Sequence, residues 1–244
     1  MKDYLSDLVT HTQGLGNIGF VKITGDNKET VIEAVSDDKA VILQGKFKNP
    51  IPDFTGVFGM PDLNKLNIIL NIPEYQENAV ITVNKKKVGE QDVASGLHFE
   101  NKVGDFKNDY RFMTTEVVNE KLKVIKFRGV AKWSLTVTPS VASIQRFKFQ
   151  SQAHSEEPLF TAKTENKTLK FYLGDISSHA GDFVFEQNIT GSVSKGWSYP
   201  VQPVLSILGL LGDKTMMLSD EGLLQITVDS GIAVYNYMLP AHAK

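Results

Sequence analysis

The residue types that most often do chemistry are present in this chain, but they are not gathered into a catalytic motif. Cysteine is absent, which excludes thiolate nucleophiles, disulfides and cysteine-based zinc sites. Ser-x-x-Lys occurs at Ser36–Lys39 and Ser192–Lys195, both in turn-like segments without the companion motifs of a serine hydrolase. The histidines are His11, His98, His154, His179 and His242. None of them forms an H-x-H or H-E-x-x-H pair, so we expect no catalytic residue, no metal site and no cofactor.

A glycine-rich segment, Gly14-Leu-Gly-Asn-Ile-Gly19, matches the G-x-G-x-x-G pattern of dinucleotide-binding loops. That fingerprint needs a strand before it and a helix after it, so that the helix N-terminus meets the pyrophosphate. Here a helical pattern precedes the glycines and a strand pattern follows them. We therefore interpret the glycines as a turn that follows the first helix.

The composition is that of an ordinary folded protein. Of the 244 residues, 41% are apolar and 22% charged, which excludes disordered and fibrous classes. The 26 basic and 28 acidic side chains give a net charge of -2, whereas proteins that grip nucleic acid with their surface usually have a markedly basic face. No signal peptide is visible, and the longest apolar stretch, 204–211, is far short of the ~20 residues of a membrane span. We expect a soluble, intracellular protein.

Most of the chain has the pattern of short antiparallel strands. Runs rich in Val, Ile, Phe, Tyr and Thr are separated by turn formers such as Gly25-Asp-Asn. Apolar and polar residues alternate in Leu169-Lys-Phe-Tyr-Leu173, which is typical of a sheet with one solvated face. The predicted strands are 20–24, 30–35, 40–47, 79–83, 97–100, 110–115, 133–138, 159–164, 168–173, 182–190, 223–229 and 233–239.

Helical spacing of apolar residues appears in four segments: 4–12, 62–71, 140–152 and 203–211. In the third, Val141, Ile144 and Phe147 recur at intervals of three residues. Asp62 and Ser140 each follow a proline and supply a capping oxygen, which favours helices that begin there.

The order of these elements repeats. Residues 1–116 have helix, strands, helix, strands, and residues 132–244 have nearly the same order, so we predict two similar α+β domains joined by a connector at 117–131. Two unrelated α+β domains are the alternative. The connector and the residue after it are rich in basic side chains: Lys121, Lys123, Lys126, Arg128 and Lys132. A solvated linker would explain these charges as well.

This organisation resembles that of the DNA polymerase sliding clamps, and most closely the processivity factor of T4-like bacteriophages. The resemblance spans nearly the full length. It rests on Leu5–Thr12 with the glycine-rich turn, on Met60–Leu70 as second helix, on Asp109–Glu116 before the connector, and on the closing segment Tyr237–His242.

The resemblance implies a fold and a function. It implies two clamp-type domains with antiparallel sheets outside and two helices per domain inside, and a ring of three subunits around duplex DNA. Such a ring tethers the replicative DNA polymerase, is opened by an ATP-driven clamp loader, and would act in the cytoplasm of an infected bacterial host. It is not an enzyme. The net charge fits, because a closed ring stays on DNA by topology and needs only weak contacts with phosphates.

The resemblance also implies three groups of site residues. The DNA-facing residues would be Lys2, His11, Lys65, Gln145, Arg146 and Lys148. A pocket for partner peptides would be lined by Val124, Ile125, Phe127, Tyr237, Leu239 and Pro240. The subunit interface would pair two edge strands that carry Tyr110, Phe112, Phe183 and Phe185. The alternative to this function is a two-domain β-rich structural or virion protein without a DNA role.

Overall fold

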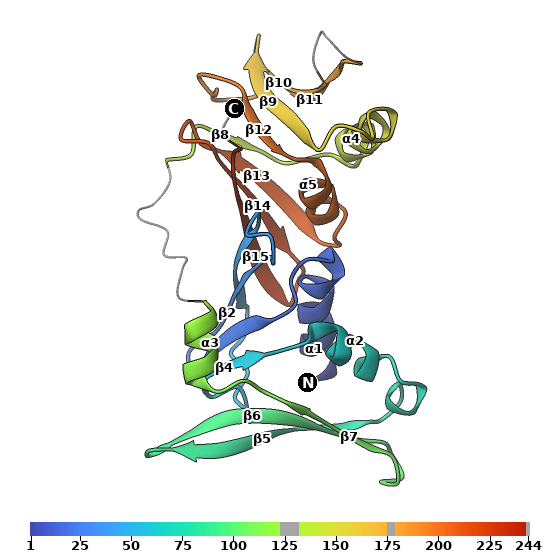
Figure 1. The fold of residues 1–244 in the computed structure, drawn as a ribbon, viewed down its shortest axis with the longest axis vertical. Helices are drawn as coiled ribbons and strands as arrows, with labels where there is room; N and C mark the ends of the chain where they lie inside the picture. Colours follow the sequence, from blue (N-terminus) through green and yellow to red (C-terminus); the bar gives the residue numbers. More distant parts are fainter. Residues whose placement is uncertain (123–131, 175–178, 243–244) are drawn as a thin grey trace. The chain divides into compact units, whose positions relative to one another are not determined.

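Two compact units make up the fold. The structure is a computed structural model that describes residues 1–122, 132–174 and 179–242. Unit 1 comprises Met1–Lys126 and Ser230–Tyr235, and unit 2 comprises Phe127–Asp229 and Asn236–Lys244. Both contain helices and antiparallel sheets (Figure 1), which confirms the predicted α+β class. The described part of the predicted connector ends at Leu122, so the division at 117–131 stays a prediction.

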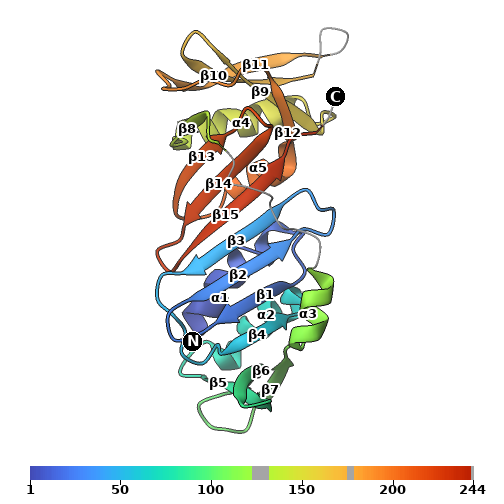
Figure 2. The same ribbon diagram turned by 90° about the vertical axis from the view of Figure 1, so that its left-hand side faces the viewer.

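The first half of unit 1 is a helix followed by a four-stranded sheet. Its elements are α1 (Lys2–Thr10), the 3-10 helix η1 (Gln13–Leu15), β1 (Val21–Gly25), β2 (Thr30–Val35), β3 (Ile42–Phe47) and β4 (Gly56–Met60). The strands lie in the order β4-β1-β2-β3, and all neighbours are antiparallel (Figure 2). The first residues of β15 (Ala233–Pro240) belong to unit 1 and lie beside β3, where Lys48 N donates to Ile232 O at 2.9 Å.

The second half of unit 1 repeats a helix and a sheet. Its elements are α2 (Leu63–Leu70), the 3-10 helix η2 (Pro73–Tyr75), β5 (Val80–Val88), β6 (Gln91–Glu100), β7 (Lys107–Arg111) and α3 (Thr115–Lys121). The sheet has the order β5-β6-β7. Helices α1 and α2 pack against each other on one face of the β1–β4 sheet (Figure 1). Each buries an apolar stripe, which in α2 consists of Leu63, Leu66, Ile69 and Leu70.

Unit 2 contains two four-stranded sheets and two helices. Its elements are β8 (Leu135–Val137), α4 (Val141–Ala153), β9 (Leu159–Glu165), β10 (Thr168–Leu173), β11 (Gly181–Gln187), β12 (Trp197–Pro200), α5 (Val201–Leu208), β13 (Asp213–Leu218), β14 (Leu223–Asp229) and the later part of β15. The sheets have the orders β11-β10-β9-β12 and β15-β14-β13-β8 (Figure 2). Helices α4 and α5 pack together.

The two units share one strand order, as the repeated element order predicts. In each, a helix leads into three consecutive antiparallel strands, and a fourth strand returns to pair with the first of them: β4 with β1, and β12 with β9. A second helix then leads into another three-stranded meander. One difference between the units lies at the outer edge of this meander: β8 pairs with β13, but no strand in the described residues pairs with β5 on the side away from β6.

The helix starts follow their predicted caps. Asp62 Oδ1 accepts a hydrogen bond from Lys65 N at 3.0 Å, and Ser140 Oγ accepts one from Ser143 N at the same distance, which confirms both capping residues. Each bond satisfies one of the free N–H groups at a helix start. None of the helices in the described part of the chain is long and apolar enough to cross a membrane.

The prediction of strand 110–115 is wrong beyond Arg111. Strand β7 ends there, and α3 begins at Thr115. After Phe112 donates to Ser95 O, the chain leaves β6, and Met113 exchanges two main-chain hydrogen bonds of 2.7 and 3.2 Å with Gly59 of β4. The segment therefore changes partner after Arg111. Three strands, β4, β12 and β13, and the helix α3 were absent from the sequence prediction.

Candidate functional site

The exposed faces of α2 and α4 hold some of the residues predicted to face DNA. On α2, Lys65 is exposed, and on α4 the exposed face carries Gln145 and Lys148. Neither Lys65 nor Lys148 has an ion-pair partner in the described part of the chain, so both ammonium groups are available to phosphates. Helix α5 contains no charged residue. The helix faces therefore provide few cations, in keeping with the net charge of -2.

Arg146 and Lys2 are already engaged within their own units. The guanidinium of Arg146 donates to Val184 O of β11 at 3.0 Å and lies 5.5 Å from the centre of the Phe183 ring. The Lys2 ammonium donates to the main-chain oxygens of Tyr75 and Gln76 at 2.8 and 3.3 Å. Both side chains hold a helix to a neighbouring element, and a contact with DNA would compete with these bonds.

His11 has no surface to offer to a duplex. Only 3% of the residue is exposed, and its ring stacks on Tyr235 with centroids 4.5 Å apart. Its Nδ1 lies 2.8 Å from Asp7 O, one turn earlier in α1. The structure places this histidine in the core of unit 1, so a role in DNA contact has no support from its position.

The strands predicted to form the subunit interface are both at the edge of a sheet. Strand β7 pairs only with β6, and β11 pairs only with β10, in the residues that the structure describes. Each strand thus leaves one row of main-chain N–H and C=O groups open for another strand. The resemblance implied an interface on strands that carry Tyr110, Phe112, Phe183 and Phe185; β7 includes only Tyr110 of the first pair, and β7 and β11 each have an open edge.

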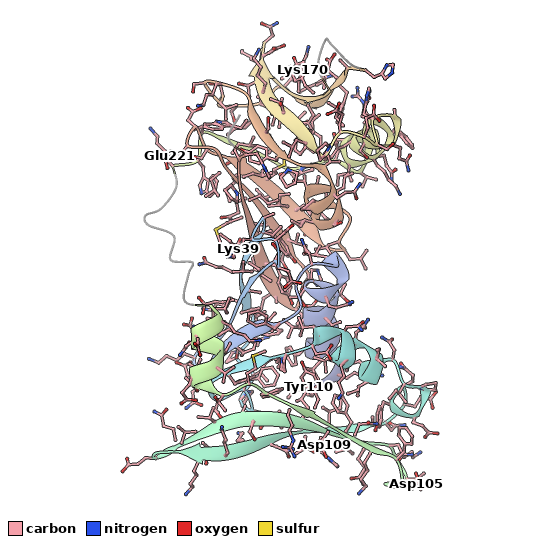
Figure 3. All side chains as sticks on the ribbon, in the orientation of Figure 1. Lys39, Asp105, Asp109, Tyr110, Lys170 and Glu221 are labelled. Carbon is pink, nitrogen blue, oxygen red and sulfur yellow. The ribbon has the colours of Figure 1, made fainter. Side chains whose placement is uncertain are left out.

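Three of the four aromatic residues named for that interface point into the cores of their own units, and the fourth, Phe112, is half-buried. Tyr110, labelled in Figure 3, is 3% exposed. Its hydroxyl donates to Pro61 O. Burial, and to a smaller extent the nearby Asp62 carboxylate, raises the pKa of this phenol. Phe112 stacks on Phe58 with centroids 4.6 Å apart. A contact between subunits through Tyr110 would require its ring to leave the core, whereas Phe112 keeps part of its surface exposed.

Phe183 and Phe185 of β11 are part of a cluster of five phenylalanines in unit 2. They are 5% and 1% exposed. Both pack against Phe171 of β10, at centroid distances of 5.7 and 4.2 Å. The side chains that β11 and β7 turn away from the core are mostly charged: the exposed Asp182 and half-buried Glu186 on β11, and the exposed Lys107, Asp109 and Arg111 on β7.

The predicted peptide pocket is not gathered by the described residues. Val124, Ile125 and Phe127 lie outside them. Tyr237 and Leu239 are fully buried, whereas Pro240 is exposed. Only Pro240 of the three C-terminal residues has a surface that a partner can reach.

A hollow of about 240 Å³ lies in unit 1 where the predicted connector begins. Its lining residues are Phe20, Val35, Ser36, Asp37, Lys39, Lys121 and Leu122. The Lys121 ammonium lies 5.4 Å from the centre of the Phe20 ring, which holds the end of α3 to the residue before β1. Sequence reasoning missed Phe20 and Val35, because only the fold brings them to Lys121.

The described residues contain no group of three or more histidines and carboxylates placed to hold a metal ion. The nearest arrangement is His98 of β6, whose Nδ1 lies 2.8 Å from Asp109 Oδ1 and whose Nε2 lies 3.5 Å from Glu100 Oε2. The two carboxylates contact opposite nitrogens of the ring. They therefore do not converge on a common point.

Comparison with known proteins gives a result in structure but not in sequence. No protein-family model and no curated protein matches the chain. The fold is similar to that of A. fulgidus PCNA, solved with the C-terminal region of FEN-1 bound, with a TM-score of 0.70, 10% identity, and coverage of 100% of this chain and 97% of that one. It is also similar to PCNA from Thermococcus kodakaraensis, with a TM-score of 0.64, 10% identity, and coverage of 99% and 97%. The chain therefore has the PCNA clamp fold along its whole length.

Proposed function

We propose that this protein is a sliding clamp: three copies close into a ring around duplex DNA, and the ring tethers a replicative DNA polymerase. The observation that carries the proposal is the likeness to two PCNA structures over at least 99% of this chain and 97% of each of theirs. A clamp has no chemical step to perform, and the proposal assigns no catalytic residue.

The charge distribution supports a protein that stays on DNA because it encircles the duplex, and not because its surface binds the phosphates tightly. A protein that binds DNA through its surface releases counterions, and its affinity falls steeply with salt. At a net charge of -2, with Lys65 and Lys148 as exposed cations of α2 and α4, this chain makes few such contacts. Contacts with phosphates position a protein without reading sequence, and a few of them let a ring slide.

The open edges of β7 and β11 support ring closure. In unit 1, the first residues of β15 lie beside β3. In unit 2, β11 occupies the position that β3 has in unit 1. In unit 1, β7 occupies the position that β15 has in the meander β13-β14-β15. We therefore infer that β7 of one copy pairs with β11 of the next, as β15 does with β3. The exposed Lys107 and Arg111 of β7 complement Asp182 and Glu186 of β11.

The hollow beside Phe20 and Lys121 is the proposed entry to the partner site. It lies at the end of α3, which precedes in sequence the residues Val124, Ile125 and Phe127 to which the resemblance assigns peptide binding. One of the similar structures was solved with the C-terminal region of another protein bound. We infer that a short segment of the polymerase docks in this hollow in a comparable way. A short segment of an ATP-driven loader would use the same hollow.

The narrower assignment to the clamps of T4-like bacteriophages belongs to this proposal. It rests on the resemblance of Leu5–Thr12, Met60–Leu70, Asp109–Glu116 and Tyr237–His242. If the protein is a clamp of this kind, it acts in the cytoplasm of an infected bacterium.

The topological mechanism can be tested without a loader, by threading. The protein is mixed with a linear duplex that carries biotin at both ends, and streptavidin is added either before or after the protein. We expect the complex to survive gel filtration at moderate salt only when the ends are blocked after the protein has threaded. Cutting the duplex should then release the protein. Retention that does not depend on the order of addition, or that survives cutting, would contradict the proposal.

The interface can be tested by charge reversal. Arg111→Glu on β7 or Glu186→Arg on β11 should each weaken trimer formation about tenfold in sedimentation equilibrium, because like charges then meet across the edge. The double variant should recover most of the affinity. Lys28→Glu, an exposed change in the turn between β1 and β2, is the matched control. A wild-type chain that stays monomeric at micromolar concentration would overturn the ring itself.

A further inference from the structure

Strand β5 is an edge strand of its sheet in unit 1, and its outer edge is not paired with another strand in the described residues. Strand β5 has nine residues, and in the described part of the chain only β6 pairs with it. Val80, Thr82 and Asn84 are all exposed, and Val80 shows 57% of its surface. A long open edge is a template for pairing with another chain, and proteins usually cover or block it.

Unit 2 shows what the same position accepts. The strand at the place of β5 is β13, and its outer edge carries β8 in antiparallel pairing. Leu135 pairs with Leu218, and Val137 with Met216. Leu135 and Val137 are buried and Thr136 between them is exposed. Three residues with alternating apolar side chains are thus enough to fill this position in the fold.

The edge of β5 differs in character between its two halves. The first half, Val80–Asn84, is uncharged, and its first four residues are β-branched, which favours strand pairing. The second half begins with a bulge between Asn84 and Lys85 and continues through Lys86 and Lys87. Bulges and lysines are devices that discourage indiscriminate pairing at an edge. The receptive part of the edge is therefore short and ends at three positive charges.

Two of these lysines lie near acidic residues of their own unit but are not held in ion pairs with them: Asp92 of β6 lies opposite Lys87 in the sheet, and the charge of Lys86 helps to lower the pKa of Glu116. Lys85 Nζ lies 3.6 Å from Asp53 Oδ1. Neither Lys86 nor Lys87 forms an ion pair within the described residues, and both are exposed. An approaching strand with carboxylates at this end would be attracted, and one with basic residues would be repelled.

We propose that the edge of β5 binds an extended, acidic segment of a partner protein by strand addition. The segment pairs antiparallel with Val80–Asn84, as β8 pairs with β13, and carries apolar residues at alternate positions. Because the pairing is antiparallel, its N-terminal end lies beside the C-terminal half of β5, and its acidic residues contact Lys86 and Lys87. Main-chain hydrogen bonds supply the affinity, and the lysines select the partner. The site is independent of the ring and of the hollow beside Phe20.

The test uses a synthetic peptide, Glu-Asp-Glu-Leu-Thr-Val-Thr, which joins an acidic N-terminus to the sequence of β8. We expect saturating peptide to slow amide hydrogen exchange in Val80–Asn84 at least tenfold, with no comparable change in β13. A peptide N-methylated at alternate residues has the same charge and side chains but lacks half of the donors. It should bind at least tenfold more weakly.

The charge requirement has its own controls. The double variant Lys86→Gln, Lys87→Gln should bind the acidic peptide about fivefold more weakly than the wild-type protein at low salt. This difference in affinity between wild type and variant should shrink as salt is added. A peptide with the same residues in reverse order has its carboxylates at the C-terminus, away from Lys86 and Lys87. The wild-type protein should bind it as weakly as the double variant binds the original peptide. Equal binding of the N-methylated peptide, or no protection of β5, would overturn the proposal. So would protection of β5 that grows with protein concentration alone, because a second copy would then be the occupant.

Discussion

The two units follow the same strand order with different side chains in their cores. The sheet β4-β1-β2-β3 of unit 1 is packed largely with aliphatic residues: Val21, Ile23, Ile32, Ala34 and Leu43. The sheet β11-β10-β9-β12 of unit 2 is packed largely with aromatic ones: Phe160, Phe171, Phe183, Phe185 and Tyr199. The repeat therefore lies in the order of elements and in the alternation of buried and exposed positions. Residue identity can diverge as long as that alternation is kept.

The units also differ in which edges they leave open. In unit 1 the edge of β3 has β15 beside it, whereas the corresponding edge of β11 is open in the described residues. In unit 2 the edge of β13 has β8 beside it, whereas that of β5 is open. Each covered edge shows what its open counterpart can accept. Both proposals above follow from this comparison.

The largest effect that distinguishes the cores is expected at Phe171. Its ring lies 4.2 to 5.7 Å from those of four other phenylalanines, among them Phe185 and Phe183. Phe171→Ala should lower the free energy of unfolding of unit 2 by about 3–5 kcal/mol, because a large buried ring leaves a cavity. Ile32→Val, in the aliphatic sheet of unit 1, should lower that of unit 1 by about 0.5–1.5 kcal/mol.

Native-state hydrogen exchange measures both variants, since amides of β10 and β2 report on the two units separately. A loss in unfolding free energy below about 2 kcal/mol for Phe171→Ala would mean that the neighbouring rings move to fill the cavity, which would contradict the expectation of a rigidly packed cluster. An equal effect on the amides of β2 would show that the units do not unfold separately.

Strands with clear alternation were predictable from the sequence. Strands β2, β10 and β14 match the predicted segments residue for residue. Strands β4 and β12 were missed because they are short and contain glycines or a proline, and β13 was missed because its polar start weakens the local signal. They are strands because β1, β9 and β14 pair with them, and such pairing overrides local preference.

The site was predictable at the level of segments but not of side chains. Alternation shows that a strand has two faces, yet it does not tell which face the fold buries. Tyr110 and Phe183 were therefore assigned to a surface, although both point into a core. His11 and Lys2 are held by residues far away in the sequence, Tyr235 and Tyr75. Such partners follow from the fold and not from helical spacing.

The next largest effect concerns the residues that hold β15 beside β3 in unit 1. Asp7 Oδ2 accepts hydrogen bonds from Tyr235 OH at 2.7 Å and from Ser230 Oγ at 3.0 Å. Tyr235→Phe removes one donor from a nearly buried carboxylate, which should lower the free energy of unfolding of unit 1 by about 1.5–3 kcal/mol. Chemical denaturation measures the loss. The matched control is Tyr4→Phe, also on the α1 side of this sheet, which should change stability by less than about 0.5 kcal/mol.

A smaller effect separates the two helix caps. Asp62 caps α2 with a φ of +47°, in the left-handed region, whereas Ser140 caps α4 with a φ of -77°. Replacement by alanine should cost about 1 kcal/mol at Ser140 and about 2 kcal/mol at Asp62, where the left-handed backbone adds strain. Replacement by glycine should cost only a few tenths of a kcal/mol at either position.

Thermal denaturation of the four cap variants gives the comparison. The gap between alanine and glycine should be clearly wider at Asp62 than at Ser140. Equal gaps would contradict the left-handed cap of α2.

The smallest effects come from two buried tyrosines that differ in one bond. Tyr110 of unit 1 donates to Pro61 O, whereas the buried hydroxyl of Tyr199 in unit 2 has no hydrogen-bond partner in the described residues. Tyr110→Phe should therefore destabilise unit 1 by about 1 kcal/mol at neutral pH. Tyr199→Phe should leave unit 2 unchanged or stabilise it by about 1 kcal/mol, because it removes a buried polar group without a partner.

The pH dependence of stability separates burial from hydrogen bonding at these two tyrosines. Burial raises the pKa of both phenols, with the Asp62 carboxylate as a second cause at Tyr110. A phenol whose pKa is higher in the folded state stabilises the fold below about pH 10, and this contribution is lost as the pH rises further, by up to about 1.4 kcal/mol per pH unit. Each Tyr→Phe variant should lose the part of this alkaline decline that comes from its own phenol, although at pH 7 Tyr110→Phe destabilises its unit and Tyr199→Phe does not. A decline that persists in Tyr199→Phe would assign it to other groups, and matching signs at pH 7 would show that Tyr199 OH has a partner.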